Sequence, residues 1–110
     1  MESFHITQVE AMEAVDGVDI SFMVTGDRMS VLHYHIEPGA AVPEHSHPHE
    51  QVGYVISGQG EFSGPDGAER LSEGDSYLLP GDEPHKVENI GTDILEGIDV
   101  FSPPRPKEDY

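Results

Sequence analysis

The residues best suited to chemistry lie in one short segment of the chain, EHSHPHEQ. His45 and His47 are two residues apart, His49 follows, and the segment ends at a neutral Gln51. Imidazole is the commonest protein ligand of first-row divalent metals, and side chains two apart on a strand point to the same side. His45 and His47 therefore converge if they lie on or at the edge of a strand. Gln51 and the more distant His85 are the available further donors.

A second histidine pair with the same spacing, His33 and His35, precedes this segment. Leu32, Tyr34 and Ile36 occupy the alternate positions and form the apolar phase of a strand. Both histidines therefore fall on the opposite, more polar face of that strand. We expect them to be solvated or to make ordinary polar contacts, and a second metal site is the less favoured alternative.

The elements that must position these residues are strands. Segments of alternating apolar and polar residues recur and end at turn signals. The expected strands cover residues 18–24, 28–37, 52–57, 61–63, 68–71, 76–79, 86–90 and 94–101. With these turns, roughly eight to ten short strands are typical of an antiparallel sandwich or barrel. The chain is therefore expected to form one all-β domain, residues 1–110.

Two segments do not fit this pattern. Residues 7–14 are the only helical candidate, and they are short and poorly patterned for a helix. Residues 103–110 contain prolines and charges, so we expect this C-terminal tail to lie extended on the surface.

The charge of the chain limits its partners. It carries 22 acidic and 5 basic residues, a formal net charge of -17. Such a surface repels phosphates and anionic lipids, so neither nucleic acid nor a membrane surface is expected as a partner. Because the acids are spread along the whole chain, we favour adaptation to a high-salt cytosol over an interaction tail. No signal-peptide pattern and no long apolar run is present, which predicts a cytoplasmic protein.

Two longer motifs resemble those of the cupin superfamily. The first spans residues 39–58 and is carried by Gly39, His45, His47 and Gly58, with Gln51 where the motif has glutamate. The second spans residues 74–89 and is carried by Gly74, Pro80, His85 and Asn89, with Asp82 in place of a glycine. The resemblance implies a single-domain antiparallel β-barrel, jelly-roll-like in its architecture.

The cupin resemblance also implies one divalent transition metal inside the barrel, held by His45, His47, Gln51 and His85. Nickel, zinc, iron, manganese and copper all accept such donors. Four neutral ligands leave the metal its full charge, which favours Lewis-acid chemistry over redox cycling. The alternative is a hydrogen-bonded polar cluster without metal. His49 is out of register with the usual cupin ligands, so we do not expect it to bind the metal. A position at the mouth of the pocket is the less favoured alternative.

The run HSHPHEQVGYVISGQGEF is similar to the small pectin-degradation cupins, whose C-terminal signature matches IDVFSPPRPKEDY. This resemblance implies that Asp99, Phe101 and Arg105 line the pocket beside the metal. From the residues alone, Asp99 either faces inward with Phe101 or faces solvent while its two neighbours face the core. Arg105 either holds a carboxylate in the pocket or forms a surface salt bridge.

The function implied by the resemblance is metal-dependent conversion of unsaturated uronate monosaccharides to their linear keto form, in polysaccharide breakdown. The protein would then be a non-redox enzyme acting on an anionic sugar acid, with Asp99 transferring a proton and Arg105 holding the carboxylate. A homodimer is expected, since an open sheet edge is a liability in a monomer. Two alternatives stay open: a metal-dependent cupin dioxygenase on a small organic substrate, and a non-catalytic ligand-binding cupin.

Overall fold

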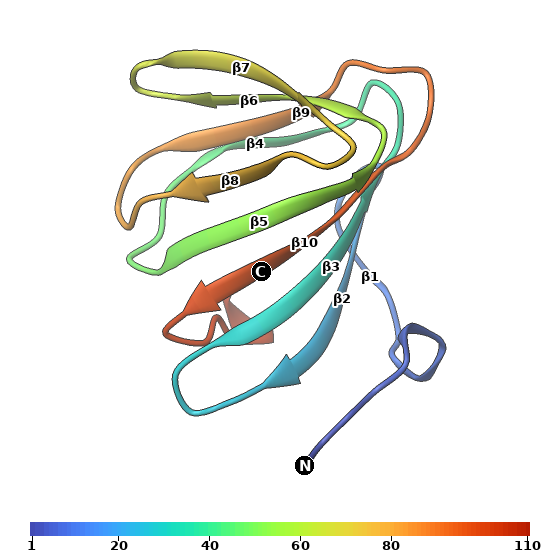
Figure 1. Ribbon diagram of the computed structural model, residues 1–110, viewed down its shortest axis with the longest axis vertical. Helices are drawn as coiled ribbons and strands as arrows, with labels where there is room; N and C mark the ends of the chain where they lie inside the picture. Colours follow the sequence, from blue (N-terminus) through green and yellow to red (C-terminus); the bar gives the residue numbers. More distant parts are fainter.

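The structure is a computed structural model that describes residues 1–110. Its ten strands form two antiparallel sheets that curve around a common interior (Figure 1). The strands are β1 (Met12–Val15), β2 (Val18–Thr25), β3 (Ser30–Ile36), β4 (Ala41–His45), β5 (Glu50–Ser57), β6 (Gln59–Gly64), β7 (Gly67–Ser72), β8 (Ser76–Leu79), β9 (His85–Asn89) and β10 (Leu95–Ser102). The six-stranded sheet has the order β1-β2-β3-β10-β5-β8, and the four-stranded sheet has the order β4-β9-β6-β7. The all-β, antiparallel expectation is confirmed.

The core lies between the two sheets and comes mainly from β2, β3 and β10. The predicted apolar phase of β3 is confirmed, because Leu32, Tyr34 and Ile36 are buried. Since strand side chains alternate between faces, the same register turns His33 and His35 outward. The other buried apolar residues are Val18, Ile20, Val55, Phe62, Leu95 and Phe101.

Residues 7–14, the short and poorly patterned helical candidate, form no α-helix. A three-residue 3-10 turn, Ile6–Gln8, is followed by β1, which pairs with β2 across the turn at Gly17. Gly17 has φ +78°, a left-handed conformation that suits a tight hairpin turn. Met12 and Ala14 pack against the core from this strand. A hairpin that buries these side chains outweighs the weak helical tendency of so short a segment.

Strand β4 was not expected, because Pro43 interrupts its pattern. It is an edge strand of the four-stranded sheet, the position where a residue without an N–H is tolerated. The strand matters for the site because it ends at His45 and pairs with β9 through His45 and His85.

The C-terminal tail lies largely on the surface, as expected, but it is not extended along its whole length. A second 3-10 turn, Lys107–Asp109, folds the tail back, and the Tyr110 ring packs edge-on against Phe22 with 5.3 Å between centroids. The backbone N–H of Arg105 donates to Ser30 Oγ at 3.1 Å. Aromatic packing and this hydrogen bond tie the tail to β2 and β3. No helix in the structure is long and apolar enough to span a membrane.

Candidate metal centre and adjoining pocket

Three histidines meet where β4, the following loop and β9 come together. His45 ends β4 directly opposite His85, which begins β9, and His47 lies in the loop that leads to β5. Each offers a ring nitrogen, and these three atoms lie within 4.8 Å of one another. The predicted convergence of His45 and His47 is found, although only His45 belongs to a strand.

The backbone fixes the orientation of all three rings. Each Nδ1 lies beside a carbonyl oxygen: Pro43 for His45 at 3.0 Å, His49 for His47 at 3.0 Å, and Glu83 for His85 at 3.1 Å. A ring that donates its Nδ1–H to a carbonyl keeps the Nε2 lone pair free for a metal. The tautomer that the backbone selects is therefore the one that a metal requires.

Two polar atoms in this cluster lack a suitable proton partner. His85 Nε2 is buried without a hydrogen-bond partner. His47 Nε2 lies 3.0 Å from Gln51 Oε1. When His47 donates its Nδ1–H to the carbonyl oxygen of His49, its Nε2 carries no proton. His47 Nε2 and Gln51 Oε1 are then both acceptors. A cation between the donors would satisfy all of them, so the four residues fit a divalent metal.

The electrostatics also favour neutral imidazoles. Burial, and next the charge of Arg105, lower the pKa of His47 below its ordinary value. Burial, and next the charge of His45, lower the pKa of His85 to about 4. Neutral rings are the metal-binding form at neutral pH.

A cavity of about 270 Å³ adjoins the cluster. His45 and Gln51 reach it from the metal side, while Asp99 and Arg105 reach it from β10 and the tail. Most of its wall is apolar, with side chains from β2, β3 and β6. Pockets for drug-sized ligands measure about 300–1,000 Å³, so this one suits a small molecule such as a monosaccharide.

Asp99 faces into this cavity from β10 and is only 8% exposed. Burial raises its pKa to about 6, against the lowering effects of Tyr77, Gln51 and Arg105. Tyr77 donates its hydroxyl to Asp99 Oδ1 at 2.5 Å, and the Tyr34 hydroxyl lies 2.9 Å from that of Tyr77. The alternative orientation of β10, with Asp99 in solvent, is wrong.

Phe101 and Arg105 form the side of the cavity nearest the tail. Phe101 packs edge-on against His47 with 5.5 Å between centroids. The Arg105 guanidinium lies 5.6 Å from the Phe101 centroid and 4.0 Å from that of Tyr110. It makes no ion pair with a carboxylate, so the surface salt bridge considered for Arg105 is absent.

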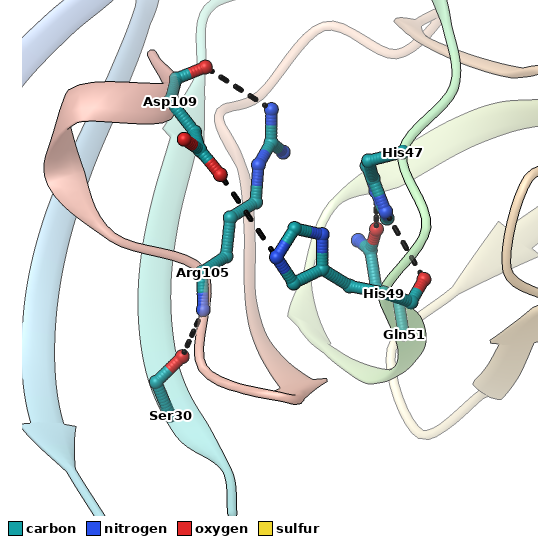
Figure 2. Close-up of polar contacts among 6 residues, drawn as sticks. All are labelled: Ser30, His47, His49, Gln51, Arg105 and Asp109. Atoms are coloured by element: carbon teal, nitrogen blue, oxygen red, sulfur yellow. Dashed lines mark hydrogen bonds and ion pairs between the residues drawn. The ribbon is translucent and has the colours of Figure 1, made fainter.

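The tail and the metal cluster meet at His49 (Figure 2). His49 Nε2 lies 3.9 Å from the Asp109 carboxylate, on the side away from His47. An Arg105 guanidinium nitrogen lies 3.5 Å from the Asp109 carbonyl. His49 therefore stays outside the histidine cluster and contacts the tail that lines the cavity.

The family comparison gives this site its context. Residues 32–101, more than half of the chain, match the cupin domain family. The chain is a cupin. The predicted membership of this superfamily is confirmed.

This cupin is similar to two pectin degradation proteins and to a polyketide cyclase. It is 30% identical over 94 residues to the pectin degradation protein KdgF of Dickeya dadantii, and the match covers 84% of each chain. The solved structure of KdgF from Halomonas sp. superposes with a TM-score of 0.88 and 25% identity, over 100% of this chain and 99% of that one. The polyketide cyclase RemF of Streptomyces resistomycificus, at 24% identity, has the same fold with a TM-score of 0.83, over 96% of this cupin and 82% of that chain.

The second cupin motif has a glycine where this chain has Asp82, and the backbone explains why aspartate is tolerated there. Asp82 has φ 64°, the left-handed conformation that glycine adopts most readily. Aspartate tolerates this region better than most residues, so the loop before His85 keeps its shape. Asn89, the last residue of the motif, is structural: its amide donates to the carbonyls of Ile36 and Asp93.

Sequence reasoning missed the two tyrosines beside Asp99. Tyr34 belonged to an apolar phase and Tyr77 to a short strand, so neither suggested a polar role. The available signal was glycine within strands: a methyl group at Gly53 would overlap the Tyr77 ring, and one at Gly97 would overlap the Tyr34 hydroxyl. Glycine in a strand interior often marks a close approach of this kind.

Proposed function

We propose that this cupin converts unsaturated uronate monosaccharides to their linear keto form. The observation that carries the proposal is the pairing of a buried Asp99 with Arg105, which has no carboxylate partner, in one cavity beside the histidine cluster. The similarity to two KdgF proteins supports the same choice of substrate class.

His45, His47, Gln51 and His85 would hold one divalent transition metal, with nickel, zinc, iron, manganese and copper as candidates. When bound, the metal supplies a Lewis acid that polarises substrate oxygens. Gln51 is the donor that keeps this set free of negative charge. Gln51 and Asp99 line the same cavity, which puts the proton-transfer group close to the metal donors.

Arg105 binds and orients the substrate carboxylate. Its guanidinium faces the cavity, and its Nε is buried without a hydrogen-bond partner. A buried donor of this kind favours an acceptor on the ligand, and a carboxylate suits the guanidinium geometry. Phe101 forms an apolar wall that supports the guanidinium and excludes water.

Asp99 moves the proton that the isomerisation requires. Opening the sugar ring releases an enol, and the enol becomes a ketone when its hydroxyl loses a proton and the neighbouring carbon gains one. A carboxyl whose pKa is raised to about 6 can both donate and accept near neutral pH. Tyr77 holds the carboxyl in place by donating to its Oδ1. No electrons are transferred, so the reaction needs no redox partner.

The proposal extends to a homodimer. The outer surface of β5 and β8 exposes Val52, Tyr54, Ile56 and Leu78, by 42%, 45%, 37% and 57%. Val52 lies opposite Leu78 across the two strands, so these side chains form one continuous patch. Apolar patches of this kind mark protein interfaces. Light scattering at micromolar concentration tests the dimer, and a monomer would remove it.

The central experiment supplies an unsaturated uronate to untagged, metal-loaded protein at high salt. Loss of the ultraviolet absorbance of the double bond should exceed the spontaneous rate. Arg105→Ala should mainly raise KM, because the residue contributes to binding. No acceleration by the wild-type protein would remove the uronate assignment. Oxygen consumption with a small organic substrate would replace it with the dioxygenase alternative, and tight sugar binding without turnover would replace it with the ligand-binding alternative.

A further inference from the structure

A second group of metal-binding side chains lies on the outer face of the six-stranded sheet. His33 and His35 project from β3, and Glu96 projects from the adjacent strand β10. His35 and Glu96 are directly opposite each other in the antiparallel register, and His33 is two residues along on the same face. Cross-strand neighbours of this kind have Cβ atoms about 5 Å apart, so their side chains meet.

The ligand atoms of these three residues gather around one point. His33 Nε2 lies 2.7 Å from Glu96 Oε2, and His35 Nε2 lies 3.5 Å from the same oxygen. All three atoms lie within 4.8 Å of one another. The two rings are steeply inclined, with an interplanar angle of 74° and centroids 4.8 Å apart. Two imidazole nitrogens therefore face one carboxylate oxygen.

We propose that His33, His35 and Glu96 form a second site for a divalent transition metal such as zinc. Two imidazoles and one carboxylate are a common donor set for this class of ion, and water completes the coordination. The site is open to solvent: the side chains of His35 and Glu96 are 47% and 31% exposed. His33 is only 14% exposed and gives the site a fixed donor at its base.

The surroundings of Glu96 favour this role. Ser57 Oγ lies 3.5 Å from the other carboxylate oxygen, Oε1. A register irregularity next to Glu96, between β10 and β5, sets the direction of this part of the strand. A chain of net charge -17 also raises the local concentration of cations.

This site is independent of the one inside the barrel and of the proposed function. The side chains of Leu32 and Tyr34, which line the inner cavity, point to the other face of β3. The two sites also differ in charge, because the outer set contains a carboxylate and the inner set contains four neutral donors.

The test removes the inner site and titrates the outer one. Untagged protein carrying His47→Ala and His85→Ala is stripped with a chelator and titrated with zinc chloride by calorimetry. It should bind one zinc ion. Adding His35→Ala, or separately Glu96→Gln, should weaken binding at least about tenfold, since even outer partners of metal ligands contribute this much. Zinc should also raise the melting temperature of the protein that keeps the outer site.

Glu88→Gln is the matched control, because it makes the same chemical change on β9 of the other sheet. It should leave zinc binding unchanged. If the double histidine variant does not fold, the wild-type protein provides the same test, with two zinc ions bound by wild type and one by His35→Ala. The proposal would be overturned if the double histidine variant bound no zinc and the wild-type protein bound no more than His35→Ala. Equal binding by Glu96→Gln and Glu88→Gln would also overturn it.

Discussion

Two histidine pairs with the same spacing sit in opposite environments in this cupin. His45 and His47 lie inside, where backbone carbonyls hold their Nδ1 atoms and His85 completes the cluster. His33 and His35 lie outside, where a carboxylate completes the group. A two-residue spacing is therefore enough to bring two imidazoles together in either environment. The third side chain, a neutral histidine inside or a carboxylate outside, then decides the charge of the group and the chemistry open to it.

Charge is the main difference between the two regions. Two of the inner histidines, His47 and His85, are buried, and burial lowers the pKa of each, which keeps their rings neutral. The outer group has an ionised carboxylate and access to water. A metal inside would keep its full charge for polarising a substrate, whereas a metal outside would be partly neutralised and hydrated. We therefore assign chemistry only to the inner region.

Removing one histidine from each region should give the largest contrast. His85→Ala should lower turnover of the unsaturated uronate to the spontaneous rate and remove the inner metal, because it deletes a buried donor. His35→Ala should leave turnover unchanged. Elemental analysis of untagged protein and the absorbance assay measure both effects. Equal metal content in His85→Ala and wild type would contradict the inner assignment.

Asp99→Asn should reduce turnover by about 10²–10⁴-fold while the inner metal stays bound, since losing one general acid–base group has this effect. The measurement is kcat with metal content determined on the same sample. Glu96→Gln is the control in the outer region and should retain wild-type turnover. A fully active Asp99→Asn protein would show that the proton moves through another group.

Gln51→Glu should make the inner region resemble the outer one by adding a carboxylate to its donors. We expect tighter metal binding and about tenfold slower turnover, because the added charge weakens the Lewis acid. Competition with a chelating dye and steady-state kinetics give the two values. Faster turnover would mean that the neutral donor is not used for polarisation.

The stability of the metal-free protein should depend on Asp99 and on pH. Burial raises the pKa of Asp99 from 3.8 to about 6, so the folded protein binds this proton more tightly than the unfolded chain does. The stabilisation by neutral Asp99 is thus present at acidic pH and is lost as pH rises from 3.8 through about 6. A shift of this size corresponds to at most about 3 kcal/mol.

Asp99→Asn should therefore gain stability relative to wild type between pH 4 and pH 8, as measured by urea unfolding. Glu96→Gln should not show this gain, because the pKa of Glu96 is lowered instead. A pH-independent difference between Asp99→Asn and wild type would contradict the raised pKa.

Salt should have the smallest effect, and it should act mainly on the surface. If the net charge of -17 reflects a high-salt cytosol, the melting temperature should rise from low salt to multimolar KCl as repulsion is screened. Differential scanning calorimetry measures this rise. Equal melting temperatures throughout would count against the halophilic interpretation.

The sequence alone determined the sheet pattern and most of the inner site. Alternation placed Leu32, Tyr34 and Ile36 in the core, and that register is strongly enforced because slipping by one residue would expose all three. The resemblance of the two motifs to those of cupins implied that His45, His47 and His85 form one group, and the pairing of β4 with β9 helps to bring them together. Residues 7–14 and the tail have weak local patterns and take their structure from contacts with β2 and β3.

Only the tertiary structure decided which distant side chains join each group. Tyr77 meets Asp99 from another strand, and Glu96 meets His33 from a position 63 residues along the chain. Neither residue carries a signal at its own position, because a tyrosine or a glutamate in a strand is ordinary until its neighbour is known. The strand order β3-β10-β5-β8 brings them together, and that order is set by long-range pairing of whole strands. Local pattern fixes which face a side chain occupies, whereas strand pairing fixes what it meets there.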